Sequence, residues 1–309
     1  MTEVYETIKN WAPIAGRWQF SSPVDAIYAS PQQQNNPFGI CVSNIRFSEG
    51  DAKVTIKLPK AGDRATTTGS GRILLGFRSV SDNYITAGLG GYGHAYNITQ
   101  FDRVQGWRGV ALAGSEDNLI PEHPYEILVR ARGQRLTLEV DRVQVLDHVL
   151  DTPLPQGQLG LFTWGTDPVE FKNTSVRMDT GTAFVVMQFS DPYQTLYTDV
   201  IKPVIEAYKL RAYHAGEVFG PGIILEDITD GIVEAKIVIT EITPPNQNVF
   251  YELGYAHALK KPTILLAESA KDLPFDVSGY RCLFYENSIG GKRKVEEGLR
   301  KHLDAILQR

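Results

Sequence analysis

Glu252 is the side chain best placed for chemistry in this sequence, because it follows a point where a strand is expected to turn into a helix. Residues 236–240 (KIVIT) form a short β-branched run that is typical of a buried parallel strand. Beyond the turn, Val249 and Leu253 follow helical spacing, and Asn248 is placed to cap the first turn. We therefore expect Glu252 on the opening turn of a helix, at a corner where open α/β sheets bind ligands.

A carboxylate at this corner suits the cleavage of an N-glycosidic bond. Backbone N–H groups at a helix start favour anions, so they are expected to lower the pKa of Glu252 and keep it ionised. An ionised carboxylate beside a sugar ring stabilises an oxocarbenium ion or attacks the anomeric carbon. Further contacts to a substrate are expected from the side chains of Gln188, Phe189, Ser190, Asp227, Glu241, Asn248 and Tyr251.

The elements that must position these side chains form a doubly wound parallel sheet. Strands are expected at residues 183–189, 210–214, 236–240, 263–267 and 281–285. Helices are expected at about residues 193–209, 223–235 and 292–308, and Pro203 should kink or restart the first of them. The common flavodoxin-like order 2-1-3-4-5 places the first and third strands side by side, with the pocket between their carboxyl ends.

The chain upstream has a different pattern and predicts an all-β sandwich. Short alternating runs recur between turn signals, at residues 51–57, 72–77, 125–130 and 135–140. This alternation is typical of antiparallel strands with one buried side. We therefore predict two domains, residues 1–179 and 180–309.

Composition excludes several classes of function. The 309 residues carry a formal net charge of -5, which gives no support for binding nucleic acid. The first twelve residues contain Glu3, Glu6 and Lys9, so a secretory signal is not expected, and no apolar run is long enough to span a membrane. Cys41 and Cys282 lack metal-ligand spacing, so we expect no metal site. Two free thiols are typical of a reducing compartment, so we expect a cytoplasmic protein. No cofactor is expected.

The C-terminal half resembles bacterial TIR-like domains related to nucleoside 2-deoxyribosyltransferases. The resemblance rests on residues 248–259 (NVFYELGYAHAL), 261–266 (KPTILL), 273–285 (LPFDVSGYRCLFY) and 290–292 (GGK). In the transferases, the matching glutamate is the nucleophile, and in TIR-type NAD hydrolases a helix-borne glutamate near the ribose is essential. The resemblance therefore implies a catalytic role for Glu252.

Two departures from the transferase pattern put transferase specificity in doubt. Glu241 stands where an aspartate is common, and residues 187–190 (MQFS) replace a Gly/Pro-rich opening. We accordingly expect a TIR-like effector that releases nicotinamide from NAD. Nucleoside deoxyribosyl transfer, nucleotide hydrolysis and a non-catalytic nucleotide-binding receptor or scaffold are the alternatives.

The N-terminal half resembles concanavalin A-like sandwiches of the laminin-G-like branch. The resemblance rests on residues 16–20 (GRWQF), 74–84 (LLGFRSVSDNY), 136–146 (LTLEVDRVQVL) and 157–162 (GQLGLF). It implies a jelly-roll fold whose concave face can hold sugars, peptides or nothing. We interpret this half as a sensor or assembly module, with a glycan or a protein as its possible ligand. Aromatic and polar side chains that could line its binding face are Tyr84, Tyr92, His94, Tyr96, Trp107 and Trp164. Such a fusion suggests an antiviral or stress effector that acts as a homo-oligomer.

Overall fold

The computed structural model describes residues 4–33, 35, 37–62, 67, 69–217, 224–268, 277 and 279–307. The chain divides into two compact units, one built mainly from residues up to Asp179 and the other mainly from Thr180 onwards. Of the described helices, none is long and apolar enough to cross a membrane.

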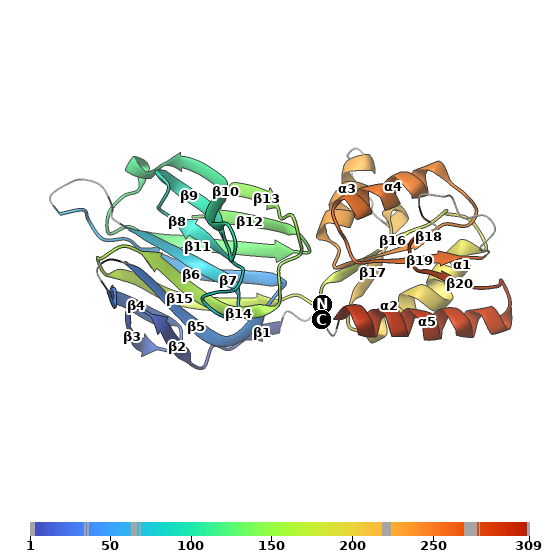
Figure 1. Ribbon diagram of the computed structural model, residues 1–309, viewed down its shortest axis with the longest axis horizontal. Coiled ribbons are helices and arrows are strands. Elements are labelled where there is room, and N and C mark those ends of the chain that lie inside the picture. Colours follow the sequence, from blue (N-terminus) through green and yellow to red (C-terminus); the bar gives the residue numbers. More distant parts are fainter. Residues whose placement is uncertain are drawn as a thin grey trace. The chain divides into compact units, whose positions relative to one another are not determined.

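The first unit is a sandwich of two antiparallel sheets (Figure 1). One sheet has the order β13-β12-β11-β6-β15-β4-β3, with β1 paired to β15. Its strands are β1 (Val4–Glu6), β3 (Arg17–Ser22), β4 (Asp25–Ser30), β6 (Gly50–Lys57), β11 (Pro124–Arg132), β12 (Arg135–Val140), β13 (Val143–Val149) and β15 (Val169–Met178).

The other sheet has the order β10-β9-β8-β7-β14-β5-β2. Its strands are β2 (Trp11–Ala15), β5 (Phe38–Phe47), β7 (Ser70–Phe77), β8 (Tyr84–Leu89), β9 (His94–Asp102), β10 (Gly106–Ser115) and β14 (Gly157–Trp164), and a 3-10 turn, η1 (Glu116–Asn118), follows β10.

Strict alternation along the strands builds the core of the sandwich. In β6, Ala52, Val54 and Ile56 are buried while the residues between them are partly exposed. Their neighbours on β11 include Ile127, which lies opposite Val54, and Val129, which lies opposite Ala52. The predicted antiparallel sandwich is therefore confirmed. The alternation of apolar and polar residues along its strands can be recognised in the sequence.

The second unit is a parallel sheet of five described strands in the order β17-β16-β18-β19-β20. Its elements are β16 (Thr182–Val186), α1 (Tyr193–Leu196), the π turn η2 (Tyr197–Ile201), α2 (Lys202–Ala207), β17 (Arg211–Tyr213), the 3-10 turn η3 (Ala215–Glu217), α3 (Ile224–Glu234), β18 (Ile237–Glu241), α4 (Gln247–Ala258), β19 (Thr263–Ala267), β20 (Cys282–Phe284) and α5 (Ile289–Leu307).

Helices cover both faces of this parallel sheet (Figure 1). Ala183 and Val185 of β16 share a core with the η2, α2 and α5 side, whereas Phe184 and Val186 pack with α3 and α4. The predicted parallel sheet and its strand order, 2-1-3-4-5, are confirmed in the described residues.

The first helical stretch of this unit was expected over residues 193–209, with a kink or restart at Pro203. It divides into α1, η2 and α2, and Pro203 lies in the first turn of α2. Proline has no N–H to donate and its ring crowds the preceding turn, which accounts for the restart. The expected start of the second helix at residue 223, and residues 273–276 and 278 of the TIR-like resemblance, lie outside the described residues.

Candidate active site

A cavity of about 470 Å³ lies at the carboxyl end of β16, on the side of the sheet that α3 and α4 cover. Four chain segments line it: the end of β16, the turn after β17, the first described turn of α3, and the start of α4. The lining residues are Met187, Gln188, Phe189, Ala215, Gly216, Asp227, Ile228, Asn246, Asn248, Val249 and Glu252.

The start of α4 aims a row of side chains into this cavity. Asn246 is the capping residue, because its side-chain Oδ1 accepts the backbone N–H of Asn248 at 2.9 Å. Glu252 lies four residues after Asn248 and three after Val249, so its side chain shares a face of the helix with theirs, and all three line the cavity. The expectation that Asn248 caps the helix was wrong, and so was the placement of Glu252 on the opening turn, since it lies in the second turn.

The pKa of Glu252 moves in the direction opposite to the sequence-based expectation. Burial raises the pKa of its carboxyl from 4.5 to about 7. The helix N-terminus acts mainly within the first turn, so it does little for a side chain in the second turn. Loss of water around the carboxylate therefore dominates.

The segment after β16 contributes an amide and an aromatic ring. Phe189 is 53% exposed, and its ring centroid lies 4.9 Å from that of His214. The Nε2 of Gln188 donates to the Oγ of Ser190 at 2.8 Å, and the Oε1 of Gln188 lies 3.5 Å from the Nδ2 of Asn246. Gln188 and Phe189 line the cavity as predicted, whereas Ser190 does not and instead holds Gln188.

Glu241 and Tyr251 were expected at the site but lie outside the cavity. Glu241 alternates with Ile237 and Ile239 along β18, so its buried side chain belongs to the opposite face of the sheet. Burial raises the pKa of Glu241 to about 8, although the Tyr285 hydroxyl and Thr243 act in the other direction. Tyr251 directly precedes Glu252 on α4, so it points elsewhere and is 57% exposed.

His214 was not recognised from the sequence and supports the cavity from behind. The backbone N–H of Gly216 donates to its Nδ1 at 3.0 Å, so the hydrogen of the neutral ring is on Nε2. Burial lowers the pKa of this imidazole, which keeps it neutral at pH 7. A single histidine after a three-residue strand gives no sequence signal for this role.

No further residue set within the described ranges suggests a metal centre. Groups of three or more His, Cys, Asp or Glu side chains that could hold a metal ion are absent from the described part of the chain. The lining residues instead supply two carboxyls, three amides and one exposed aromatic ring. This set suits a polar ring-bearing ligand such as a nucleoside.

Comparison with known proteins finds similarity of fold only. No protein-family model matches the chain, and no curated protein matches it. A carbohydrate-binding module, CBM66, from Bacillus subtilis is 16% identical with a TM-score of 0.45, covering 54% of this chain and 94% of that one. A B. subtilis protein of unknown function with a galectin-like fold is 10% identical with a TM-score of 0.41, covering 57% and 98%.

A Bacillus licheniformis β-glucanase is 14% identical with a TM-score of 0.39, covering 57% of this chain and 98% of that chain. These similarities concern the sandwich of the N-terminal half. With identities and scores this low, the similarities concern the fold alone and not the ligands or the chemistry of this chain.

Proposed function

We propose that the C-terminal unit cleaves the N-glycosidic bond of NAD and releases nicotinamide, with Glu252 as the catalytic residue. The observation that carries the proposal is the half-buried carboxyl of Glu252 in a cavity of about 470 Å³, with its pKa raised to about 7. Near neutral pH, a large share of the molecules has this carboxylate ionised. Its charge is poorly solvated and acts strongly on a neighbouring positive charge.

The reaction follows from the charge of the leaving group. When the bond between the ribose C1′ and the nicotinamide nitrogen breaks, its electron pair goes to a nitrogen that was positively charged. Nicotinamide therefore leaves as a neutral molecule and needs no proton. The positive charge that develops on the ribose is stabilised by Glu252, and water then adds to C1′ and releases a proton.

The other lining residues are suited to holding a nicotinamide riboside. Phe189 offers an exposed ring on which a flat base can stack. The amides of Gln188, Asn246 and Asn248 can bond to ribose hydroxyls and to a carboxamide, and Asp227 can accept a hydroxyl. The diphosphate would lie at the start of α4, where backbone N–H groups favour anions.

Nucleoside 2-deoxyribosyl transfer is the second candidate, and Asp227 is the observation that favours it. The neutral base of a nucleoside leaves only when it is protonated, so transfer requires a proton donor as well as a nucleophile. Asp227 and Glu252 are the two carboxyl groups among the lining residues, so they can divide these two tasks. Simple binding without catalysis is the third outcome to be tested.

Three measurements on the purified full chain separate these functions. NAD alone tests for nicotinamide release, a deoxynucleoside with a free base tests for base exchange, and calorimetry with NAD tests for binding. Glu252→Gln should lose nicotinamide release by several orders of magnitude and keep its fold. Glu226→Gln is the matched control, because this exposed glutamate lies beside Asp227 on α3 and does not line the cavity. Unchanged turnover by Glu252→Gln would exclude the catalytic assignment.

Assembly is part of the same proposal. TIR-like resemblance implies that neighbouring copies act together, and an NAD hydrolase that is always active would harm its own cell. We therefore propose an antiviral or stress effector whose sandwich senses a trigger and whose activity rises on self-association. NAD enters this scheme as substrate.

A further inference from the structure

The second sheet of the sandwich carries an apolar layer on the face turned away from the main core. Ile73 and Leu75 of β7 belong to the core, whereas Leu74 between them packs with Tyr84 and Phe162 in a separate buried cluster. The outer face of an antiparallel sheet is expected to be polar when water covers it. Here the apolar side chains of this face are buried, so other side chains and loops of the unit cover part of it.

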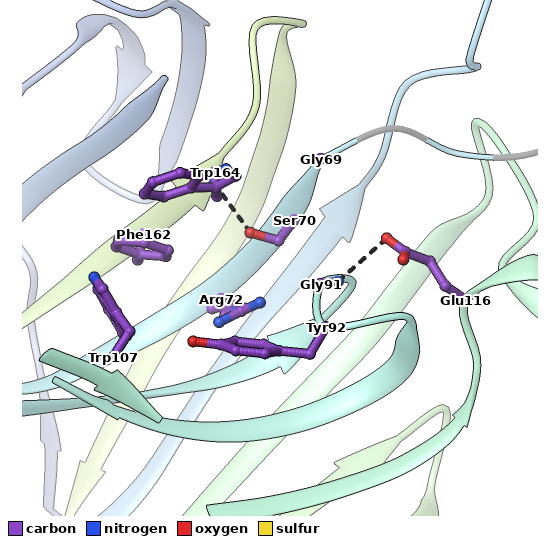
Figure 2. Close-up of a pocket in the computed structure, with 9 residues that line it drawn as sticks. All are labelled: Gly69, Ser70, Arg72, Gly91, Tyr92, Trp107, Glu116, Phe162 and Trp164. Carbon is purple, nitrogen blue, oxygen red and sulfur yellow. Dashed lines mark hydrogen bonds between the residues drawn. The ribbon is translucent and has the colours of Figure 1, made fainter. Parts of the chain in front are cut away.

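A cavity of about 410 Å³ opens on this face, and Figure 2 shows the side chains around it. It is lined by Gly69, Ser70, Arg72, Gly91, Tyr92, Trp107, Glu116, Phe162 and Trp164.

Half of the six side chains that the sequence suggested for a binding face line this cavity, namely Tyr92, Trp107 and Trp164. The other half serve other purposes. Tyr84 is buried in the apolar layer, Tyr96 packs against the main core, and the Nδ1 of His94 lies 3.2 Å from the carbonyl oxygen of Gly114.

Arg72 is a buried cation in the wall of this cavity. Only 3% of the residue is exposed, and burial lowers the pKa of its guanidinium to about 10, so it stays protonated at neutral pH. Its Nη1 donates to the Oγ1 of Thr99 at 3.0 Å, and its Nη2 donates to the carbonyl oxygen of Gly90. Both acceptors are neutral.

Arg72 has no ion-pair partner among the described residues, and its buried Nε has no hydrogen-bond partner there. Buried charges in proteins are normally paired, because an unpaired charge loses its hydration without compensation. Burial lowers the pKa of Arg72, and the charge of Glu116 offsets part of this effect. The two side chains do not form an ion pair, because the Oε1 of Glu116 accepts the backbone N–H of Gly91 at 3.2 Å at the partly exposed rim.

The surroundings of the guanidinium are aromatic. The Cζ of Arg72 lies 6.0 Å from the ring centroid of Tyr92 and 5.8 Å from that of Phe162. Tyr92 is half-exposed, while the neighbouring Gly91 approaches so closely that a Cβ there would lie 2.2 Å from the Nη2 of Arg72. The backbone thus closes one side of the guanidinium, and the half-exposed ring of Tyr92 lies on another side.

We propose that this cavity binds a sugar acid, such as a terminal uronic acid. The carboxylate of the ligand pairs with Arg72 after Tyr92 moves aside, and it supplies the anion that the buried cation lacks. A charge-assisted pair of this kind is about twice as strong as a neutral hydrogen bond. The apolar face of the sugar ring stacks on the indoles of Trp107 and Trp164, the latter 45% exposed.

Matched ligands test the proposal on the full chain by tryptophan fluorescence and calorimetry. Glucuronate and glucose differ only at the carboxylate, so glucuronate should bind at least about tenfold more tightly. Benzoate keeps the carboxylate and the ring but has no hydroxyls. Glucose binding as tight as that of glucuronate, or no binding of either, would overturn the carboxylate pairing. Benzoate binding as tight as that of glucuronate would overturn the assignment to sugars.

Three variants complete the test. Arg72→Met should weaken glucuronate binding about 10- to 100-fold and leave the affinity for glucose unchanged. Trp164→Ala changes a partly exposed side chain, so it keeps the test valid if Arg72→Met fails to fold, and it should weaken both sugars. Ile120→Ala, at an exposed residue outside the cavity, should change neither. Glucuronate affinity that survives in a folded Arg72→Met or in Trp164→Ala would contradict the proposal. None of these outcomes depends on Glu252.

Discussion

The side-chain Oδ1 of Asn246 accepts the backbone N–H of Asn248 at 2.9 Å, and both residues line the same cavity. One asparagine therefore fixes where α4 begins, while the other is free to present its amide to a ligand. The cap sets the rotation of the helix, which in turn places Glu252 in the cavity one turn after Asn248. The position of the candidate catalytic carboxyl depends on this hydrogen bond.

Replacing each of the two asparagines by alanine should separate an effect on stability from an effect on substrate binding. Asn246→Ala removes the cap and should reduce the free energy of unfolding by about 1 kcal/mol, as measured by urea titration. Asn248→Ala keeps the cap and should leave stability nearly unchanged while raising the KM for NAD. Equal stability losses in the two variants would contradict the assignment of the cap.

Nicotinamide release should depend on pH in the range of the Glu252 titration. Burial raises its pKa to about 7, and the ionised form is the one that stabilises positive charge. The kcat should therefore rise between pH 6 and pH 8, with its midpoint near 7, and level off above. The measurement is a pH series of initial rates at saturating NAD. A rate that falls over this interval would indicate that the protonated carboxyl acts, and it would contradict the role of the ionised Glu252 in stabilising positive charge.

Glu241 should make the C-terminal unit less stable as pH rises. Its pKa is about 8 in the folded chain and about 4.5 when exposed, so the folded state binds its proton more tightly. The free energy of unfolding therefore falls as pH rises from about 4.5 to about 8, and it levels off above. Glu252 contributes in the same direction, but only up to about pH 7.

Glu241→Gln isolates this effect. The amide keeps an acceptor for the N–H of Thr243, which lies 2.9 Å from the carboxylate Oε1. Urea titrations at pH 7 and pH 8 should show a smaller loss of stability in this variant than in the unaltered chain. Glu226→Gln, at an exposed position, should behave like the unaltered chain. An equal loss of stability in all three proteins would contradict the raised pKa of the buried Glu241 carboxyl.

The fold was predictable from the sequence where burial leaves a simple pattern. The residues of β18 and β19 are almost all buried, so these strands read as continuous apolar runs, and β6 reads as strict alternation. The break at η2 was less visible. The sequence showed Pro203, but the register in which the chain restarts depends on how the segment packs on the sheet.

The site was predictable in part, because sequence distance says little about which face a side chain occupies. Glu252, Asn248 and Asp227 reached the cavity as expected. Glu241 did not, since a shift of one residue along a strand moves a side chain to the opposite face. His214 was missed because its role depends on a hydrogen bond from Gly216, a backbone group that leaves no mark on the sequence.

Self-association should control activity. If neighbouring copies complete or order the site, the specific activity should rise steeply with protein concentration, because assembly follows mass action. Initial rates over a hundredfold range of concentration, with parallel light scattering, give the measurement. A constant specific activity from a protein that stays monomeric would remove the assembly proposal and leave the chemistry of Glu252 untouched.

Two glycines on neighbouring helices should respond oppositely to alanine. A Cβ at Gly231 of α3 would lie 2.6 Å from the Cε2 of Phe184, a buried side chain of β16. At Gly254 of α4 a Cβ would meet no atom of the described residues within 4 Å, so this glycine does not mark a close contact. The close approach of helix to strand is at Gly231.

Gly231→Ala should therefore destabilise the unit by about 1–3 kcal/mol, because α3 must move away from β16 to make room for the new methyl group. Asp227 lies one turn earlier on α3 and lines the cavity, so the same movement should raise the KM for NAD although Gly231 does not line it. Gly254→Ala should instead stabilise α4 by up to about 1 kcal/mol and leave KM unchanged. Thermal unfolding and steady-state kinetics of both variants give the measurement. A Gly231→Ala protein with unaltered stability and KM would show that the position of α3 does not depend on its contact with Phe184.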